Sequence, residues 1–153
     1  NAHEIHQTIY DKSLAYYFRQ ELSDVQFISP IFQEIVDRSR EISPDMYFSA
    51  LSEQENLTAK VSQAFGENDF LFLPTTAGEA PNLESVELTD SSLIWTLLGF
   101  PMVTVPLLKG RTGLPVGVTF VGRKYSDYEL LKFVGQHVMT GDSEVIMPSN
   151  ITA

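Results

Sequence analysis

The spacing of apolar residues divides the chain into a helical first part and a mixed second part. Up to residue 66, apolar side chains recur every three or four positions, which predicts amphipathic helices. We expect the first helix at Tyr10–Leu22. Two more begin at Ser29-Pro30 and Ser43-Pro44, because serine accepts a first-turn amide hydrogen and proline needs no partner there.

From Asp69 onward the pattern becomes that of strands separated by loops. Phe70–Leu73 is a short continuous apolar run ended by Pro74, which is typical of a strand buried on both faces. A loop rich in small and turn-forming residues follows over Thr75–Glu87. Asp90–Leu98 is predicted to be a short helix.

Two further strands are predicted at Met102–Leu108 and Val116–Val121. The link Lys109–Gly113 between them is short and turn-rich, which favours an antiparallel hairpin. Ser126 and Glu129 have the spacing of a capping box and predict the start of the last helix. Residues from 139 onward are expected to form a tail.

These elements predict an α/β fold, with a mixed β-sheet and flanking helices. We expect residues 1–153 to form a single domain. It would contain a helical part at 1–66 and a strand–helix–hairpin–helix part at 67–139.

Glycines and prolines mark the ends of several predicted elements. Gly66 and Gly99 predict left-handed helix ends. Pro106 predicts the end of a strand, because proline cannot donate to a β-ladder. Gly117 lies inside a predicted strand, which indicates that a neighbouring element approaches closely. Architecture therefore accounts for these residues without a catalytic role.

The balance of charge disfavours two classes of partner. Twenty acidic and ten basic residues give a formal net charge of −10. Such a surface repels phosphate backbones and anionic lipids, so we expect neither nucleic-acid binding nor membrane docking. No apolar run approaches the ~20 residues that a membrane-spanning helix needs.

The chain has no cysteine. This excludes a disulfide, a thiol nucleophile and a thiolate metal site within these residues. It fits a reducing compartment, and we expect a cytoplasmic location. The chain begins with Asn1 rather than methionine, which favours a processed chain or a fragment.

Short glycine- or proline-containing stretches recur through the second half of the chain. They are Leu73-Pro74-Thr75, Ala80-Pro81, Leu98-Gly99-Phe100-Pro101, the strand to Pro106, and Gly113-Leu114-Pro115 with the strand to Gly122. In order and spacing they resemble the closing segment of the amidase signature family, and stretch 41–47 is loosely similar to the family's sequence before its long helix. The resemblance implies that this chain is the C-terminal part of the amidase-signature fold.

The resemblance also implies a mechanism whose residues are missing here. The family uses a serine nucleophile, a bridging serine and a lysine, and it needs no cofactor. Amide hydrolysis requires such a nucleophile and base, but the chain has no Gly-Gly-Ser-Ser run or Ser-x-x-Lys spacing. Ser91-Ser92 has no neighbouring glycine, and the five lysines lie in polar contexts. We therefore expect no catalytic residue in this chain, and no activity from it alone.

The residues that this segment would contribute are those of a substrate pocket. In related enzymes, residues just ahead of the Gly-x-Pro strand line the pocket, and the matching positions here are Asp90, Ser91, Trp95 and Thr96. Asp90 would pair with a polar or cationic group and Trp95 would form an apolar wall. A helix N-cap and a core position are the structural alternatives for these two residues. Thr96 stands where many relatives have asparagine, which weakens the transfer of a role.

A metal site is not expected. His3 and His6 are three residues apart, which is not the His-Glu-x-x-His spacing, and no cysteine or distant carboxylate cluster completes a ligand set.

Two functions remain open from the sequence. In the first, the chain belongs to an amidase, either an enzyme that acts on a small-molecule amide or an amidotransferase subunit, and its partner is the remainder of that enzyme. In the second, it is a non-catalytic binding or accessory module that kept the fold. A fragment would expose the apolar face that its missing part covered, and it would self-associate through that surface.

Overall fold

The computed structural model describes residues 1–23, 28–67, 69–82, 84–85 and 92–138. They form two compact units, Asn1–Ala59 and Lys60–Ala153, whose boundary falls inside one long helix. The expectation of a single domain, with parts at 1–66 and 67–139, stays a prediction.

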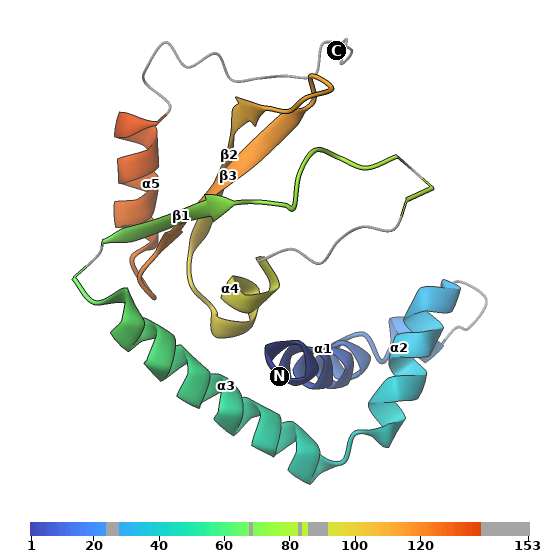
Figure 1. The fold of residues 1–153 in the computed structure, drawn as a ribbon. Helices are drawn as coiled ribbons and strands as arrows, with labels where there is room; N and C mark the ends of the chain where they lie inside the picture. The colour runs from blue at the N-terminus through green and yellow to red at the C-terminus, as the bar shows by residue number, and fades with distance from the viewer. Residues whose placement is uncertain (24–27, 68, 83, 86–91, 139–153) are drawn as a thin grey trace. The chain divides into compact units, whose positions relative to one another are not determined.

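The first unit contains the helices α1 (Ala2–Tyr17), α2 (Pro30–Glu41) and most of α3 (Pro44–Phe65), with a 3₁₀ turn η1 (Glu21–Ser23) (Figure 1). Ser29 Oγ accepts from Phe32 N at 3.4 Å and Ser43 Oγ from Met46 N at 3.2 Å, so both predicted Ser-Pro helix starts are confirmed.

The predicted helix Tyr10–Leu22 was wrong in its bounds. Helix α1 begins eight residues earlier, since Ile5 continues its buried side, and its last helical amide bond is Phe18 N to Leu14 O at 3.0 Å. After Phe18 the chain forms turns and the 3₁₀ turn η1, with one further backbone bond from Leu22 N to Phe18 O at 2.8 Å.

Charged side chains join α1 to α2. Asp11 is 1% exposed, and its two carboxylate oxygens accept from Arg38 Nε at 2.7 Å and Nη2 at 3.1 Å. Lys12 Nζ donates to the carbonyls of Ser39 at 3.1 Å and Ile42 at 2.7 Å. The Lys12 cation therefore satisfies carbonyls that the end of α2 leaves unpaired.

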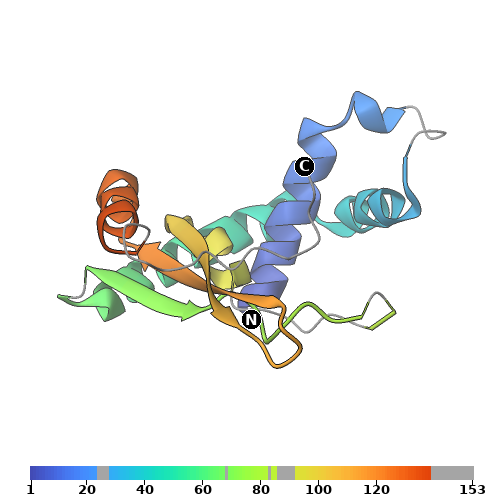
Figure 2. The ribbon, with the colours of Figure 1, turned by 90° about the horizontal axis from the view of Figure 1, so that it is seen from above.

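The second unit is built on a three-stranded sheet of β1 (Phe70–Pro74), β2 (Met102–Lys109) and β3 (Pro115–Gly122), in the order β1-β3-β2 (Figure 2). Both pairings are antiparallel, with Phe72 opposite Phe120 and Thr104 opposite Thr119. The predicted β2–β3 hairpin and its place beside the Phe70–Leu73 strand in one sheet are confirmed.

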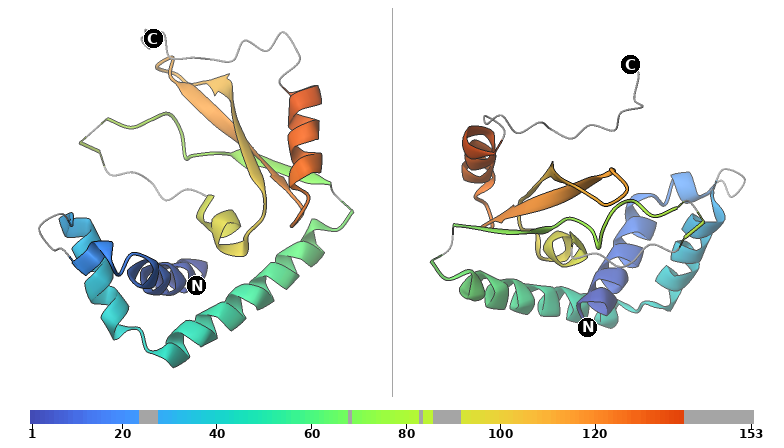
Figure 3. Two further views of the ribbon diagram at one scale, coloured as in Figure 1. Left: turned by 180° about the vertical axis from the view of Figure 1, so that it is seen from behind. Right: turned by 45° about the horizontal axis from the view of Figure 1, so that its top comes forward.

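Helices α5 (Asp127–His137) and α4 (Ser92–Leu98) lie on opposite sides of this sheet (Figure 3). Under α5, Val105, Leu130 and Val134 form a buried cluster, and Phe120 and Phe133 pack against it. The predicted α/β fold with flanking helices is therefore confirmed, while the described strands of the predicted mixed sheet pair only in antiparallel fashion.

Strand β1 is less buried than its apolar sequence predicts. Phe72 is 77% exposed, so the expectation of burial on both faces was wrong. The reason is its position, since β1 is an edge strand of the described sheet and no described helix covers Phe72.

Proline 106 does not end β2. The ladder shifts register between Val105 and Leu108 and then continues to Lys109, so Pro106 lies in an irregularity of the strand. A bulge leaves a residue out of the ladder, which is why proline is tolerated there.

The predicted capping box at the start of α5 is only partly right. Ser126 is the N-cap residue, but its side chain makes no capping bond. Its Oγ instead donates to the carbonyl of Arg123 at 2.7 Å. The left-handed backbone conformation predicted at two glycines is confirmed, with φ values of 59° at Gly66 and 68° at Gly99.

Candidate functional site

The sheet face opposite α5 carries a chain of three hydroxyls. Thr119 Oγ1 lies 2.8 Å from Thr75 Oγ1 and 2.9 Å from Thr104 Oγ1, so one bonded hydroxyl comes from each of β3, β2 and the end of β1. Thr119 is only 3% exposed. The two bonds of the buried Thr119 hydroxyl make this cluster a cross-link of the three strands.

Gly117 makes room for the cluster, as its position inside a strand predicted. A Cβ built there would lie 2.6 Å from Thr75 Oγ1 and 3.0 Å from Thr104 Cγ2. The backbone of Thr75 is fixed as well, since its amide donates to the carbonyl of Gly117 at 3.0 Å. The start of the loop that follows β1 is thus held at one defined place on the sheet.

The structure does not gather the four predicted pocket residues into one described site. Asp90 and Ser91 lie outside the described residues. Trp95 and Thr96 are both on α4, but Thr96 is exposed whereas Trp95 is half-buried. Adjacent residues on a helix point in different directions, so the side chains of Trp95 and Thr96 lie in different surroundings.

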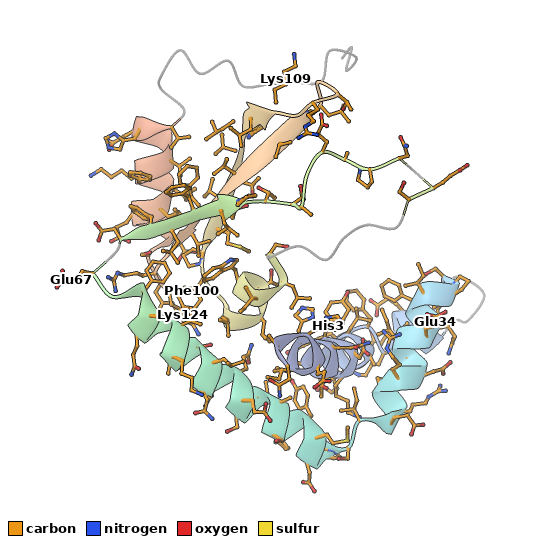
Figure 4. All side chains as sticks on the ribbon, viewed as in Figure 1. His3, Glu34, Glu67, Phe100, Lys109 and Lys124 are labelled. Carbon is orange, nitrogen blue, oxygen red and sulfur yellow. The ribbon has the colours of Figure 1, made fainter. Side chains whose placement is uncertain are left out.

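Trp95 belongs to an aromatic cluster beside α4. Its ring meets that of Phe100 edge-on, with centroids 5.8 Å apart, and Phe100 stacks on Phe65 at the same separation. Figure 4 labels Phe100. The indole Nε1 is buried and finds no hydrogen-bond partner among the described residues. Burying an indole N–H without a hydrogen-bond partner costs free energy. Among the described residues, Nε1 is the polar atom of this cluster that could still donate a hydrogen bond.

The sequence analysis missed the threonine cluster, although a signal was present. Thr104 and Thr119 are polar residues in the middle of otherwise apolar strands. Such interruptions indicate a polar network when the strands pair in a register that brings them opposite each other, and here Thr104 and Thr119 are cross-strand partners.

A hollow of about 340 Å³ lies in the first unit, among mostly apolar side chains. It contains none of the predicted pocket residues. Its lining consists of Phe18, Glu21, Leu22, Ile28, Ser29 and Phe32.

The two N-terminal histidines show no ligand set. Within the described residues, no group of three or more His, Asp or Glu side chains could hold a metal ion. His6 stacks on Tyr10 with centroids 5.6 Å apart, and burial followed by repulsion from His3 lowers the pKa of His6. No helix in the described part of the chain is long and apolar enough to cross a bilayer.

Comparison with known proteins gives consistent matches. Residues 9–131 match the sequence profile of the family described as Amidase. Over 102 residues the chain is 30% identical to a glutamyl-tRNA(Gln) amidotransferase subunit of Treponema denticola, a match that covers 61% of this chain and 21% of that protein. Over 84 residues it is 31% identical to the fatty acid amide hydrolase of Oryza sativa subsp. indica, covering 46% of this chain and 14% of that protein.

The fold of this chain also matches that of a solved structure. The solved structure described as a crystal structure of amidase superposes with a TM-score of 0.78 at 25% identity, covering 88% of this chain and 34% of that chain. The chain therefore spans about a third of that structure and about a fifth of the first relative, whose covered share is 21%.

Proposed function

Since this chain belongs to the amidase family, we propose that it forms the C-terminal part of an enzyme that hydrolyses the C–N bond of a small-molecule amide. The match over residues 9–131 is the observation that carries the proposal, because it includes both the sheet and α4. The remainder of the enzyme is the partner of this segment, and we place the enzyme in the cytoplasm.

The chemistry would proceed through an acyl-serine intermediate. A serine oxygen attacks the amide carbonyl, the C–N bond breaks as the amine leaves with a proton, and water then hydrolyses the resulting ester. The catalytic serines and the lysine lie on sequence outside these 153 residues. The threonine cluster supports this division, since its hydroxyls bond one another and form a scaffold.

The contribution of this chain would be substrate binding. Asp90, Ser91, Trp95 and Thr96 remain the proposed pocket residues, and of these Trp95 and Thr96 lie on α4 in the described part of the chain. Support comes from the buried, unpartnered Nε1 of Trp95, because a bound amide carbonyl would give it an acceptor. The aromatic contact with Phe100 would fix the orientation of the indole ring.

A small-molecule amide is favoured over a tRNA-linked substrate at this segment. One relative is named as an amidotransferase subunit that acts on glutamyl-tRNA(Gln). However, the net charge of −10 gives no support to contact with a phosphate backbone.

Steady-state kinetics of the full-length gene product tests the pocket assignment. Trp95→Phe removes the indole N–H and keeps an aromatic ring, so we expect kcat/KM for amide substrates to fall about 10-fold, the usual scale for one lost hydrogen bond at a site. The matched control is Tyr128→Phe on α5, which removes the hydroxyl of a tyrosine that is 87% exposed. Equal kcat/KM in the wild type and the Trp95 variant would contradict the assignment.

The 153-residue chain tests where the chemistry resides. We expect it to hydrolyse no simple amide. Turnover that persists in a purified wild-type chain and disappears on heat denaturation would contradict the placement of the catalytic serines elsewhere.

A further inference from the structure

Glu79, in the loop that follows β1, inserts its carboxylate into the turn between β2 and β3. Oε1 accepts from Thr112 N at 2.9 Å, from Thr112 Oγ1 at 2.8 Å and from Leu114 N at 3.2 Å. Oε2 accepts from Thr112 N at 3.2 Å. Three donors of one turn thus converge on a carboxylate that is more than 30 residues distant in sequence.

The turn has the shape of an anion receptor. It is closed by Gly110 N to Leu114 O at 2.9 Å and by Gly113 N to Gly110 O at 3.2 Å, and Gly113 has a φ of 92°. Successive amides in such a turn point to one side and bind anions. Lys109 and Arg111, the cationic residues of this turn, add positive charge near the receptor, and Figure 4 places Lys109 at the end of β2.

Gly110 leaves the space that Glu79 fills. A Cβ built at Gly110 would lie 2.0 Å from both Cγ and Cδ of Glu79. The φ of Gly110 lies outside the left-handed region, and the three atoms nearest to an added Cβ all belong to the Glu79 side chain. The glycine and the glutamate therefore fit as a pair, which an incidental surface contact would not require.

We propose that Glu79 is a positioning residue whose ionised carboxylate latches the loop at residues 75–82 to the β2–β3 turn. At one end the loop is already held by Thr75, through its bonds to Gly117 and Thr119. The latch fixes a second point of the same loop, at Glu79. That α4 lines a substrate pocket rests on the proposed function, whereas the latch rests on the contacts of Glu79 alone.

Bonding to the charged form gives the latch a pH dependence. The hydrogen bond from the Thr112 hydroxyl, followed by those from the backbone amides, lowers the pKa of Glu79. A carboxylate with a lowered pKa stabilises the closed state above the ordinary pKa of glutamate. This contribution is lost as the pH falls through the lowered value. The latch is thus closed at neutral pH and opens in acid.

Amide hydrogen exchange and NMR titration of the 153-residue chain test the latch. Two variants remove it by separate routes: Glu79→Gln removes the charge, and Gly110→Ala displaces an unchanged Glu79. We expect exchange of the Thr112 and Leu114 amides to become at least about 10-fold faster in both variants, since a charge-assisted bond is lost. The matched control is Gly78→Ala, in the same loop, where an added Cβ meets nothing within 4 Å.

In the wild type, the Thr112 and Leu114 amide shifts are expected to follow one titration at a pH below the ordinary range of glutamate. Glu79→Gln should abolish that titration. Two results would overturn the latch. One is that the Thr112 and Leu114 amides exchange at the wild-type rate in both variants. The other is that these amide shifts titrate in Glu79→Gln as they do in the wild type.

Kinetics of the full-length gene product tests the positioning role separately. We expect Gly110→Ala to raise KM about 3- to 10-fold with a smaller change in kcat, because a loosened loop weakens binding before chemistry. Gly78→Ala should leave both constants unchanged. If Gly110→Ala accelerates amide exchange but leaves KM unchanged, the positioning role is overturned and the latch stands. A wild-type protein without amidase activity would overturn the proposed function, while the exchange experiment would still decide on the latch.

Discussion

The hydroxyl of Thr75 occupies the space that a side chain at Gly117 would fill, with only 2.6 Å between Thr75 Oγ1 and the position of a Cβ at Gly117. The same hydroxyl bonds Thr119, and the amide of Thr75 bonds the carbonyl of Gly117. The end of β1 is therefore anchored to β3 through one glycine and one hydroxyl chain.

Gly117→Ala is expected to destabilise the chain by about 1–3 kcal/mol, the usual cost of overpacking. The φ of Gly117 lies outside the left-handed region, so the effect would come from the clash alone. Gly135→Ala is the control, because a Cβ there meets nothing within 4 Å and alanine favours a helix by about 0.5–1 kcal/mol. Urea denaturation measures both. A Gly117 variant as stable as the wild type would contradict the packing described.

Arg38→Met is expected to weaken the helical unit far more than Arg40→Met. Losing Arg38 leaves the buried carboxylate of Asp11 without its ion-pair partner. Arg40 pairs with Asp37 at 2.8 Å, but both side chains are more than half exposed, and such pairs contribute little. Thermal unfolding followed by circular dichroism should show a fall in Tm several times larger for Arg38→Met. Equal falls would show that the Asp11 pair is not structural.

His6 should make α1 sensitive to mild acid. Burial and repulsion from His3 lower its pKa, while Asp11 opposes them. The folded chain then binds a proton less readily than the unfolded chain. The contribution of neutral His6 to the free energy of unfolding is therefore fully present above about pH 6.5, the ordinary histidine value. It falls as the pH drops below that value.

Far-UV circular dichroism at about pH 7.5 and pH 5.5, on either side of the ordinary histidine value, measures this effect. We expect a lower Tm at the acid pH in the wild type and a smaller difference in His6→Gln. The control His137→Gln alters a histidine on α5 and should behave as the wild type does. The same pH dependence in His6→Gln and the wild type would assign the effect to other groups.

Local rules predicted the parts of the fold that local chemistry decides. The Ser29 and Ser43 helix starts and the left-handed glycines 66 and 99 follow from a few neighbouring residues, and all four are confirmed. The close approach at Gly117 follows from the same reasoning, although the sequence did not identify Thr75 as the neighbour.

The errors come from contacts between residues far apart in sequence. The polar sequence around Lys12 does not identify its hydrogen-bond partners, which are carbonyls at the end of α2, 27 and 30 residues away. The apolar run around Phe72 indicates burial, yet it carries no information about strand order, and the strand lies at a sheet edge. In the candidate site, the threonine cluster depends on strand register, which hydrophobic pattern alone did not specify.

Phe72→Lys is expected to reduce self-association of the 153-residue chain. Phe72 is 77% exposed on an edge strand, and such surfaces pair with other chains. Sedimentation velocity should show a smaller average species for Phe72→Lys at an unchanged Tm. Tyr125→Lys, at a residue that is 87% exposed and outside the sheet, is the control. A monomeric wild-type chain would contradict the expectation.

Labelling with a serine-directed fluorophosphonate tests the central claim most directly, namely that this chain binds substrate for chemistry performed by other residues. Intact-mass analysis of the folded 153-residue chain should show no adduct under conditions that label the full-length gene product completely. An adduct on Ser91 or Ser92 would place the nucleophile in this segment and contradict the account.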